Sequence, residues 1–306
     1  MIQQSANAVV MIRPFRFYPN PETASDNAFQ REVASADADT ISKAAQEEFD
    51  QAVAQLRDAG VTVHVFADTA SPEKPDAVFP NNWFSTHQDG RIALYPMYSA
   101  ARRSERRRDV IDDLRKHYRV LDVVDYSASE QQQKYLEGTG SLVLDRVNRI
   151  AYASLSQRTH PEVLKQFCHD FGYEAVTFQS QSEDGRPVYH TNVMMCVGSK
   201  LALVGLGMIA DEAERTEVQV ELETTGKEVI DLTSNQIANF AGNAIELHNE
   251  KGKLLVLSVR AASVLSEDQR AIINRHAQIV QLSLPTIELA GGSARCMIAE
   301  IHLPRL

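Results

Sequence analysis

The sequence predicts a mixed α/β fold in which five similar units form a closed, pseudo-fivefold α/β propeller around a central channel. Three observations support this. A polar or glycine-rich segment leads into an apolar strand five times, these segments recur at nearly constant spacing, and the elements that follow them repeat in the same order. No linker or low-complexity segment divides the 306 residues, so we expect one domain over residues 1–306.

The repeat is defined by one anchor residue in each unit. Successive anchors are separated by 58, 52, 51 and 52 residues, a regularity that favours a repeated architecture over chance. The anchors are Asn82, Gly140, Asn192, Asn243 and Arg295.

Each of the first four anchors is followed by a strand, a turn, a return strand, a helix and a third strand. The turn signals are Asp89-Gly90, Val147-Asn148, Gly198-Ser199 and Lys251-Gly252. The return strands are expected at 92–95, 150–155, 201–206 and 254–259. Apolar residues three and four apart predict helices at 104–116, 160–171, 210–223 and 266–276. Third strands are expected at 120–124, 175–178, 229–232 and 279–284.

The fifth unit begins near Ser293, and the sequence reaches Leu306 before a return strand can form. Near the other end of the sequence, an apolar run at 8–12, a helical pattern at 41–56 and a strand at 61–66 supply the missing elements. We therefore expect both ends of the sequence to share one unit and close the ring.

Composition excludes several classes of protein. With 43% hydrophobic and 24% charged residues the chain is an ordinary globular protein, and its net charge of −10 argues against a nucleic-acid partner. It shows neither a signal peptide nor an apolar run long enough to span a membrane. Three cysteines argue against a disulfide framework and for a cytoplasmic location. A homo-oligomer is compatible with the sequence, which does not fix the oligomeric state.

Two motifs have plain structural interpretations. The segment 204–210 resembles a dinucleotide-binding fingerprint, but other units have only a turn between strand and helix at this place, so we predict a tight turn. The basic stretch 101–109 is interrupted by acids and is interpreted as the solvated face of a helix. No spacing of His and Cys suits zinc, and we expect neither a metal nor a cofactor.

The three cysteines differ in their surroundings. Cys168 lies in a helical pattern and Cys196 in an apolar strand, as expected of small core residues. Cys296 follows the glycine-rich loop 291–295, whose backbone N–H groups, together with Arg295, can favour a thiolate. On position alone, a buried structural cysteine is the alternative.

The repeat brings a catalytic combination together. Cys296, His190 and Glu137 each lie within three residues of an anchor, and equivalent positions of a ring converge on its axis. A nucleophile, an acid/base group and a carboxylate that orients it are what nucleophilic catalysis needs. We therefore predict a catalytic site in the channel.

Segments along nearly the whole chain resemble the guanidine-modifying enzyme superfamily, whose fold is the five-bladed α/β propeller called pentein. Its members include arginine deiminases, dimethylarginine hydrolases, succinylarginine dihydrolase and amidinotransferases. Within it, the chain is most similar to the arginine-deiminase-related, amidinotransferase-like branch that includes citrulline utilization hydrolases. The resemblance is carried by residues 11–14, 20–30, 78–84, 137–141, 189–195, 240–243 and 291–296.

The resemblance implies that Cys296 is the nucleophile, His190 the general acid/base and Glu137 the carboxylate that contacts a substrate nitrogen. Deiminases usually hold the guanidinium with two aspartates, but this sequence has His87 and Asn192 at those positions. Burying a cation against neutral partners is costly, whereas an asparagine amide can donate to a ureido oxygen and accept from its NH₂ group. We therefore predict a hydrolase of the ureido group of citrulline or a close analogue. It would work through a thiocarbamoyl intermediate and yield ornithine, ammonia and CO₂.

Other residues are expected to bind the small amino-acid substrate. Arg295 and Arg13 are candidates for its α-carboxylate, with an ion pair within the protein as the alternative for each. Asn82 is expected opposite Asn192. The segment 20–30, with Asn27, is expected to close over the site; alternatively, Ser25 or Asp26 simply caps a helix.

Two alternative functions stay open. An arginine-type guanidine deiminase or dihydrolase is compatible with Glu137, which remains as one anion. A non-catalytic pentein that binds the ribosome as a translation factor would share the architecture, but it would leave Cys296, His190 and Glu137 unexplained.

Overall fold

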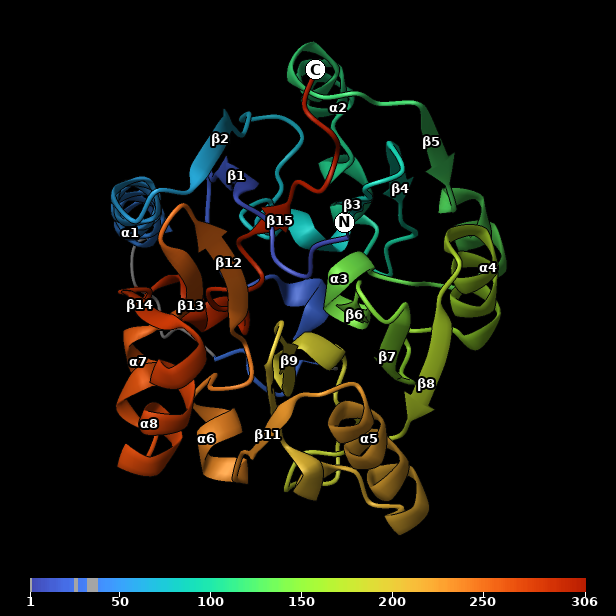
Figure 1. Ribbon diagram of the computed structural model, residues 1–306. Helices are drawn as coiled ribbons and strands as arrows, with labels where there is room; N and C mark the ends of the chain where they lie inside the picture. The colour runs from blue at the N-terminus through green and yellow to red at the C-terminus, as the bar shows by residue number, and fades with distance from the viewer. Residues whose placement is uncertain (1, 25–26, 32–37) are drawn as a thin grey trace.

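The computed structural model describes residues 2–24, 27–31 and 38–306. Five three-stranded sheets surround a central axis, and the longer helices lie on the outside of the ring (Figure 1). The predicted pseudo-fivefold α/β propeller is therefore confirmed.

The first four sheets, or blades, share one topology: the first two strands form an antiparallel hairpin and the third pairs parallel to the second. The first three hairpins turn at the predicted positions, and the fourth turns one residue earlier, because Gly252 already pairs with Asn249. The strands are β3 (Phe84–Thr86), β4 (Arg91–Leu94) and β5 (Asp122–Asp125); β6 (Val143–Asp145), β7 (Ile150–Ser154) and β8 (Glu174–Phe178); β9 (Met195–Val197), β10 (Leu201–Val204) and β11 (Glu228–Asp231); and β12 (Ile245–Asn249), β13 (Gly252–Ser258) and β14 (Gln278–Leu282).

The fifth blade joins segments from opposite ends of the sequence. Its central strand β1 (Ala8–Arg13) pairs antiparallel with β15 (Ala299–Glu300) and parallel with β2 (Thr62–Ala67). The prediction that N-terminal elements complete the fifth unit is thus confirmed.

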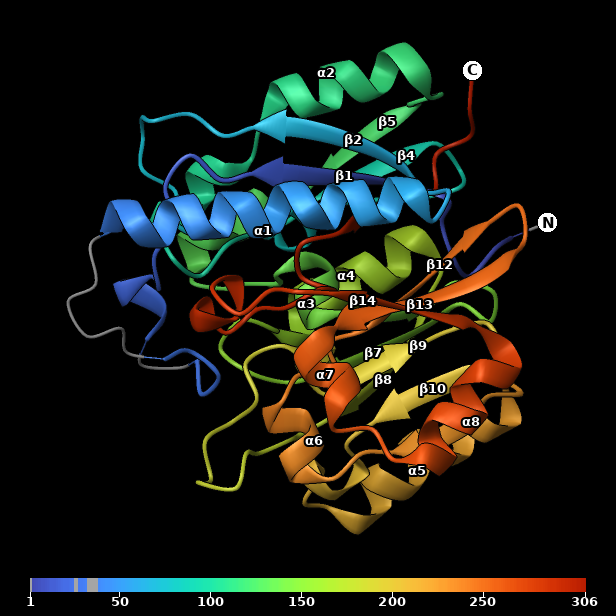
Figure 2. The ribbon, with the colours of Figure 1, turned by 90° about the vertical axis from the view of Figure 1, so that its left-hand side faces the viewer.

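One long helix connects the second and third strands of each blade. α1 lies alongside β1 and β2 in Figure 2 and buries one apolar face against them. The helix of the first blade begins later than predicted, because residues 101–105 form a separate 3₁₀ turn. The helices are α1 (Ala38–Asp58), α2 (Arg108–His117), α4 (Pro161–Phe171), α5 (Glu212–Thr224) and α8 (Glu267–His276).

Short helical turns lie between these elements, and three of them occupy the first three anchors. They are η2 (Pro80–Asn82), α3 (Gly138–Ser141) and η5 (Thr191–Val193), and each precedes the first strand of a blade. α3 contacts both other turns, so these anchors meet at the ring's centre. The remaining short turns are η1 (Pro21–Thr23), η3 (Ala101–Glu105), η4 (Ser127–Gln132), η6 (Leu206–Met208), α6 (Ser234–Ala238), α7 (Val259–Ser263) and η7 (Ile287–Ala290).

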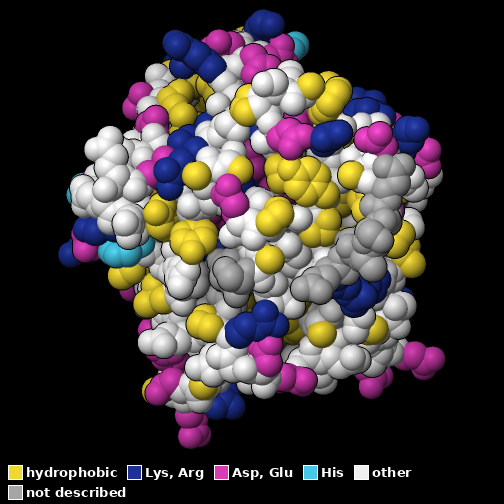
Figure 3. All heavy atoms as spheres, turned by 180° about the vertical axis from the view of Figure 1, so that it is seen from behind, with side chains coloured by type: hydrophobic (Ala, Val, Ile, Leu, Met, Phe, Trp, Pro, Cys, Tyr) yellow, Lys and Arg dark blue, Asp and Glu magenta, His cyan; other side chains and the backbone are white. Residues whose placement is uncertain are grey.

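Several smaller predictions can be compared with the fold. The segment that outlined a dinucleotide fingerprint is the tight turn η6, held by a hydrogen bond from the Leu206 N–H to Asp231. Cys168 and Cys196 are buried core residues, as predicted. Acidic and basic side chains are interspersed on the face opposite that of Figure 1 (Figure 3). None of the described helices is long and apolar enough to cross a membrane.

Candidate active site

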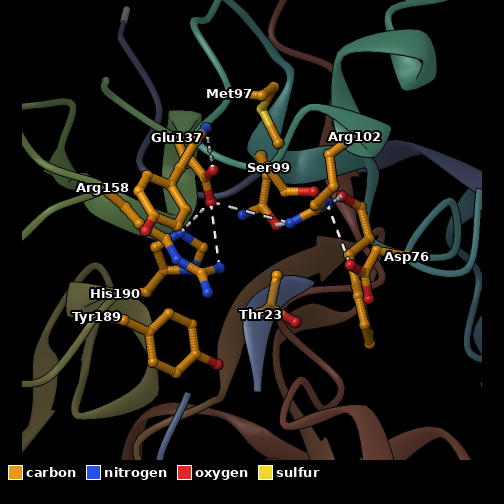
Figure 4. A network of polar contacts seen from close by, with 12 residues as sticks. Thr23, Asp76, Met97, Ser99, Arg102, Glu137, Arg158, Tyr189 and His190 are labelled. Atoms are coloured by element: carbon orange, nitrogen blue, oxygen red, sulfur yellow. Dashed lines mark hydrogen bonds and ion pairs between the residues drawn. The ribbon is translucent and has the colours of Figure 1, made fainter. Parts of the chain in front are cut away.

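Glu137 and His190 meet at the centre of the ring. Glu137 precedes the first turn of α3, and His190 precedes η5 on the neighbouring blade. Their side chains are in direct contact, with His190 Nε2 2.8 Å from Glu137 Oε2 (Figure 4). Both are buried, so the structure brings together two of the three predicted catalytic residues.

Glu137 is the hub of a polar network. Its Oε1 accepts a hydrogen bond from the Tyr98 N–H at 2.8 Å, and its Oε2 lies 3.5 Å from Arg158 and 3.9 Å from Arg102. Burial alone would raise the pKa of Glu137, but the Arg158 guanidinium and the hydrogen bond from His190 outweigh burial and hold that pKa far below its usual range. Glu137 is therefore ionised at neutral pH.

An ionised Glu137 fixes the tautomer of His190. A carboxylate only accepts hydrogen bonds, so Nε2 of His190 carries a proton and Nδ1 is the basic nitrogen of the neutral ring. Burial lowers the pKa of His190, although the hydrogen bond to Glu137 opposes this. The neutral form of His190 is thus the form available at neutral pH to accept a proton.

Gly140 leaves room for these side chains. A Cβ atom at this position would lie 2.4 Å from Asn82 Nδ2 and 2.8 Å from His190 Nδ1. Real Cβ atoms essentially never approach so closely, so an anchor without a side chain keeps His190 and Asn82 beside each other.

Cys296 lies in a tight turn after the glycine-rich loop, where its N–H bonds the carbonyl of Ser293 at 3.0 Å. Its Sγ atom lies 3.2 Å from Asn243 Nδ2 and 3.5 Å from Asn192 Nδ2. Asn192 follows His190 by two residues on η5, which links the Cys296 turn to the Glu137–His190 pair. Asn243 thus presents its NH₂ group to the sulfur of the predicted nucleophile, whereas Asn192 contacts it with both ends of its amide, its Oδ1 accepting from the thiol at 3.9 Å.

The loop before Cys296 is held from two sides. The Ser293 hydroxyl donates to the buried Glu288 carboxylate at 2.7 Å, and the Tyr189 hydroxyl donates to the Gly291 carbonyl at 2.8 Å. Asn27 donates to the Ala290 carbonyl at 3.1 Å. Asn27 is therefore docked onto this loop. The alternative caps Ser25 and Asp26 lie outside the described residues.

Arg102 corrects one prediction. The stretch 101–109 was interpreted as a solvated helix face, but Arg102 is only 3% exposed and its guanidinium reaches the site. It pairs with Glu105 at 2.9 Å, lies 3.7 Å from Asp76 and donates to Asn82 Oδ1 at 2.9 Å. Burial raises the pKa of Glu105 to about 7, although Arg102 opposes the shift.

The contact with Arg102 orients the Asn82 amide. A guanidinium can only donate, so Oδ1 of Asn82 faces Arg102 and its NH₂ group faces away. This Nδ2 atom is buried and has no hydrogen-bond partner among the described residues. An unpaired buried donor beside His190 is suited to an acceptor on a substrate.

The two arginines predicted to bind the α-carboxylate are engaged elsewhere. Arg13 forms a two-point ion pair with Asp50 on the surface, at 2.8 and 2.9 Å. Arg295 donates to the Ile298 carbonyl at 2.8 Å and to Glu300 at 3.0 Å. Each thus forms the alternative ion pair within the protein.

Sequence reasoning missed four residues of this region: Arg102, Arg158, Asp76 and Asn243. Asn243 had a usable signal, because it is a repeat anchor like Asn192. Arg102 had a weaker one: an acidic residue follows three positions later, the spacing of an ion pair on a helix. In the described part of the chain, no group of three or more His, Cys, Asp or Glu residues is placed to hold a metal ion.

The sequence was compared with models of known families. Residues 13–303 match the model described as N,N dimethylarginine dimethylhydrolase, eukaryotic. The chain belongs to this family. It is accordingly a hydrolase of the pentein guanidine-modifying superfamily, homologous to enzymes that act on guanidino C–N bonds. A search among curated proteins gives no significant match.

Solved structures of similar shape agree with the family's fold. One is the N-terminal domain of ArgZ, an arginine dihydrolase from the ornithine–ammonia cycle in cyanobacteria, solved as a cysteine-to-serine variant with bound substrate. It is 16% identical to this chain, with a TM-score of 0.73, and the match covers 97% of this chain and 99% of that chain. Unliganded AgrE has 16% identity and a TM-score of 0.76 over 99% of this chain, which spans 40% of AgrE. Dimethylarginine dimethylaminohydrolase, as a histidine-to-glycine variant in an adduct with S-methyl-L-thiocitrulline, has 13% identity and a TM-score of 0.64 over the whole of both chains.

Proposed function

We propose that this enzyme hydrolyses the ureido group of L-citrulline or a close analogue, in the cytoplasm and without a cofactor, to ornithine, ammonia and CO₂. The observation that carries the proposal is the set of amides around Cys296 and His190. The NH₂ groups of Asn243 and Asn192 lie 3.2 and 3.5 Å from the sulfur, and the buried NH₂ group of Asn82 beside His190 has no hydrogen-bond partner among the described residues. A ureido oxygen can accept from such donors, whereas a guanidinium has only donors of its own.

The charges of the site support a neutral reacting group. Glu137 is already paired with His190 and Arg158, and Asp76 and Glu105 both lie against Arg102. The cationic guanidinium of a substrate would compete with these two arginines for the same carboxylates. A ureido group makes no such demand.

The reaction would begin with a proton transfer from Cys296 to neutral His190. The sulfur then attacks the ureido carbon, forming a C–S bond while the carbon–oxygen π electrons move to oxygen, where amide donors stabilise the charge. Collapse of this adduct breaks the bond to the δ-nitrogen, which takes the proton from His190 and leaves as ornithine. A thiocarbamoyl group remains on Cys296.

Water would complete the reaction. His190 takes a proton from water as its oxygen attacks the thiocarbamoyl carbon, the C–S bond breaks, and the sulfur leaves as a thiolate that His190 reprotonates. The carbamic acid released falls apart into ammonia and CO₂. Covalent chemistry of this kind is supported by ArgZ, because an asparagine-to-serine variant of that protein was solved covalently bonded to a reaction intermediate.

Arg102 and Arg158 replace Arg295 and Arg13 as our candidates for the substrate's α-carboxylate. Both guanidiniums are buried and converge on the Glu137 side of the site. A guanidinium fork matches a carboxylate at two points, and a buried one does so with little competition from water.

A guanidine substrate is the second candidate, and one observation favours it. Asp76 is a buried carboxylate at the site that the sequence did not reveal, and it lies close to Arg102 at 3.7 Å. If Arg102 moved to a substrate carboxylate, Asp76 and Glu137 would be two anions able to hold a guanidinium. The matching family model is named for such a substrate.

Product analysis separates these candidates. The purified protein is incubated separately with L-citrulline, L-arginine and N,N-dimethyl-L-arginine, and the products are identified by mass spectrometry, with Cys296→Ala as the control. Ornithine from citrulline, absent with the variant, supports the proposal. The opposite result is that arginine or dimethylarginine yields citrulline while L-citrulline itself stays intact. This would overturn the citrulline proposal in favour of a guanidine substrate.

A further inference from the structure

Asn243 is the anchor of the fourth unit, and its side chain also contacts Cys296 and the backbone around it. Its side chain is fully buried and makes hydrogen bonds in three directions. Oδ1 accepts from the Arg295 N–H at 3.1 Å, while Nδ2 donates to the Asn192 carbonyl at 2.9 Å and lies 3.2 Å from Cys296 Sγ. All three partners belong to the immediate surroundings of the nucleophile.

These partners fix which end of the amide faces the sulfur. The Arg295 N–H can only donate and the Asn192 carbonyl can only accept, so the Asn243 amide fits in one orientation alone. One N–H of its NH₂ group satisfies the Asn192 carbonyl. The other is directed to Cys296 Sγ and is a stronger donor to a thiolate than to a thiol.

We propose that Asn243 is a catalytic residue whose NH₂ group stabilises the Cys296 thiolate, both before the sulfur attacks and when it leaves the thiocarbamoyl intermediate. This role rests on the proposed covalent reaction. Cys296 is buried, where an unpaired anion would be unfavourable, and the donor is held in place before the charge forms. Asn192, the equivalent anchor of the preceding blade, supplies a second and longer contact at 3.5 Å.

The equivalent asparagines have diverged around the ring. Asn82 occupies the anchor of the first blade, but its Oδ1 is turned to Arg102, and its NH₂ group has no partner in the part of the chain that the structure describes. Asn243 turns its NH₂ group to the sulfur instead, and Asn192 contacts the sulfur with its Nδ2 at 3.5 Å and its Oδ1 at 3.9 Å. One repeated residue thus serves the substrate on one side of the site and the nucleophile on the other.

The test follows the thiolate itself. Its ultraviolet absorbance is measured against pH as the difference between each protein and the same protein carrying Cys296→Ser. Asn243→Ala removes the donor, and Asn243→Asp keeps the shape and the acceptor for the Arg295 N–H but places an anion near the sulfur. Asn235→Ala, on the exposed face of α6, is the matched control.

We expect the midpoint of thiolate formation to rise by about one to two pH units in Asn243→Ala, the range of a lost hydrogen bond to a charged group, and further in Asn243→Asp. The control should not move. An unchanged midpoint in both Asn243 variants, with circular dichroism showing them folded, would overturn the proposal and leave Asn243 a structural residue.

The readout is independent of the substrate. If the midpoints move but citrulline is not hydrolysed, the role of Asn243 at the sulfur survives and the proposed substrate fails. If citrulline is hydrolysed and the midpoints do not move, the substrate stands and Asn243 has no role in the charge of Cys296.

Discussion

Two buried clusters in this molecule have the same composition, one glutamate, one histidine and two arginines, but different surroundings. The Glu137 cluster consists of Glu137, His190, Arg102 and Arg158; the Glu300 cluster consists of Glu300, His302, Arg146 and Arg295. In the second cluster the carboxylate lies 3.1 Å from the histidine and 3.0 and 3.6 Å from the two guanidiniums. In both clusters burial lowers the pKa of the histidine, and the arginines hold the pKa of the glutamate far below its usual range against the effect of burial.

The difference lies in what surrounds each cluster. In the Glu300 cluster, Arg295 also donates to the Ile298 carbonyl and Arg146 to the Thr86 carbonyl, so the charges hold the backbone together. Beside the Glu137 cluster lies the NH₂ group of Asn82, which is buried and has no hydrogen-bond partner among the described residues. Proximity to Cys296 does not separate the clusters, because Arg295 of the Glu300 cluster directly precedes Cys296. Perturbed pKa values therefore do not distinguish a candidate site from a structural ion-pair cluster, whereas a buried donor without a partner does.

Exchanging each glutamate for glutamine gives the largest expected effect. We expect Glu137→Gln to lower kcat about 10³-fold, because His190 loses the carboxylate that fixes its tautomer. Glu300→Gln should retain kcat but lower the free energy of unfolding by about 3–5 kcal/mol, since two buried arginines lose their partner. Steady-state kinetics give kcat and thermal unfolding gives the stability of both variants. Equal losses of kcat in the two would contradict a catalytic role for the Glu137 cluster and a structural role for the Glu300 cluster.

A methyl group at position 140 tests whether the Glu137 cluster needs the room that Gly140 leaves for His190 and Asn82. The added Cβ would lie 2.4 Å from Asn82 Nδ2 and 2.8 Å from His190, so one of them must move. We expect Gly140→Ala to lower kcat about 10²-fold, because displacing a catalytic side chain by about one ångström is enough to slow a reaction that much. Gly207→Ala is the control, since its Cβ meets nothing within 4 Å. Full activity in Gly140→Ala would show that this close packing is not needed.

Acid should weaken the Glu300 cluster through His302. Burial, followed by Arg146, lowers the pKa of His302 from 6.5 to about 4. The unfolded chain therefore binds a proton at this residue below pH 6.5 that the folded protein refuses until about pH 4. Its contribution to stability is complete above pH 6.5 and is lost as pH falls toward 4, by up to about 1.4 kcal/mol per pH unit. Thermal unfolding across this range should show a shallower decline for His302→Gln, and identical declines would contradict the assignment.

Much of the fold was predictable because each blade repeats the same local signals. Apolar alternation and turn residues placed the strands, and the constant spacing of the anchors indicated the ring. Cys296, His190 and Glu137 could be singled out because they lie beside anchors. Their contacts confirm that Glu137 and His190 meet.

The arginines could not be assigned from the sequence. Arg102 lies in a stretch of charges, and its partners Asp76 and Glu137 come from distant parts of the chain. Arg295 precedes Cys296 directly, but neighbouring side chains in a turn point in different directions, and its guanidinium is directed to Glu300. Whether an arginine faces a substrate or an internal carboxylate depends on contacts between blades, which local pattern does not record.

The shared fifth blade has a consequence for how the enzyme is made. β1 and its antiparallel partner β15 lie far apart in the sequence, and Cys296 comes shortly before β15. A chain translated only as far as β14 therefore contains β1 and β2 but neither β15 nor Cys296. One short segment both pairs the free edge of β1 and carries the nucleophile, so we expect a chain interrupted before this segment to be inert rather than partly active.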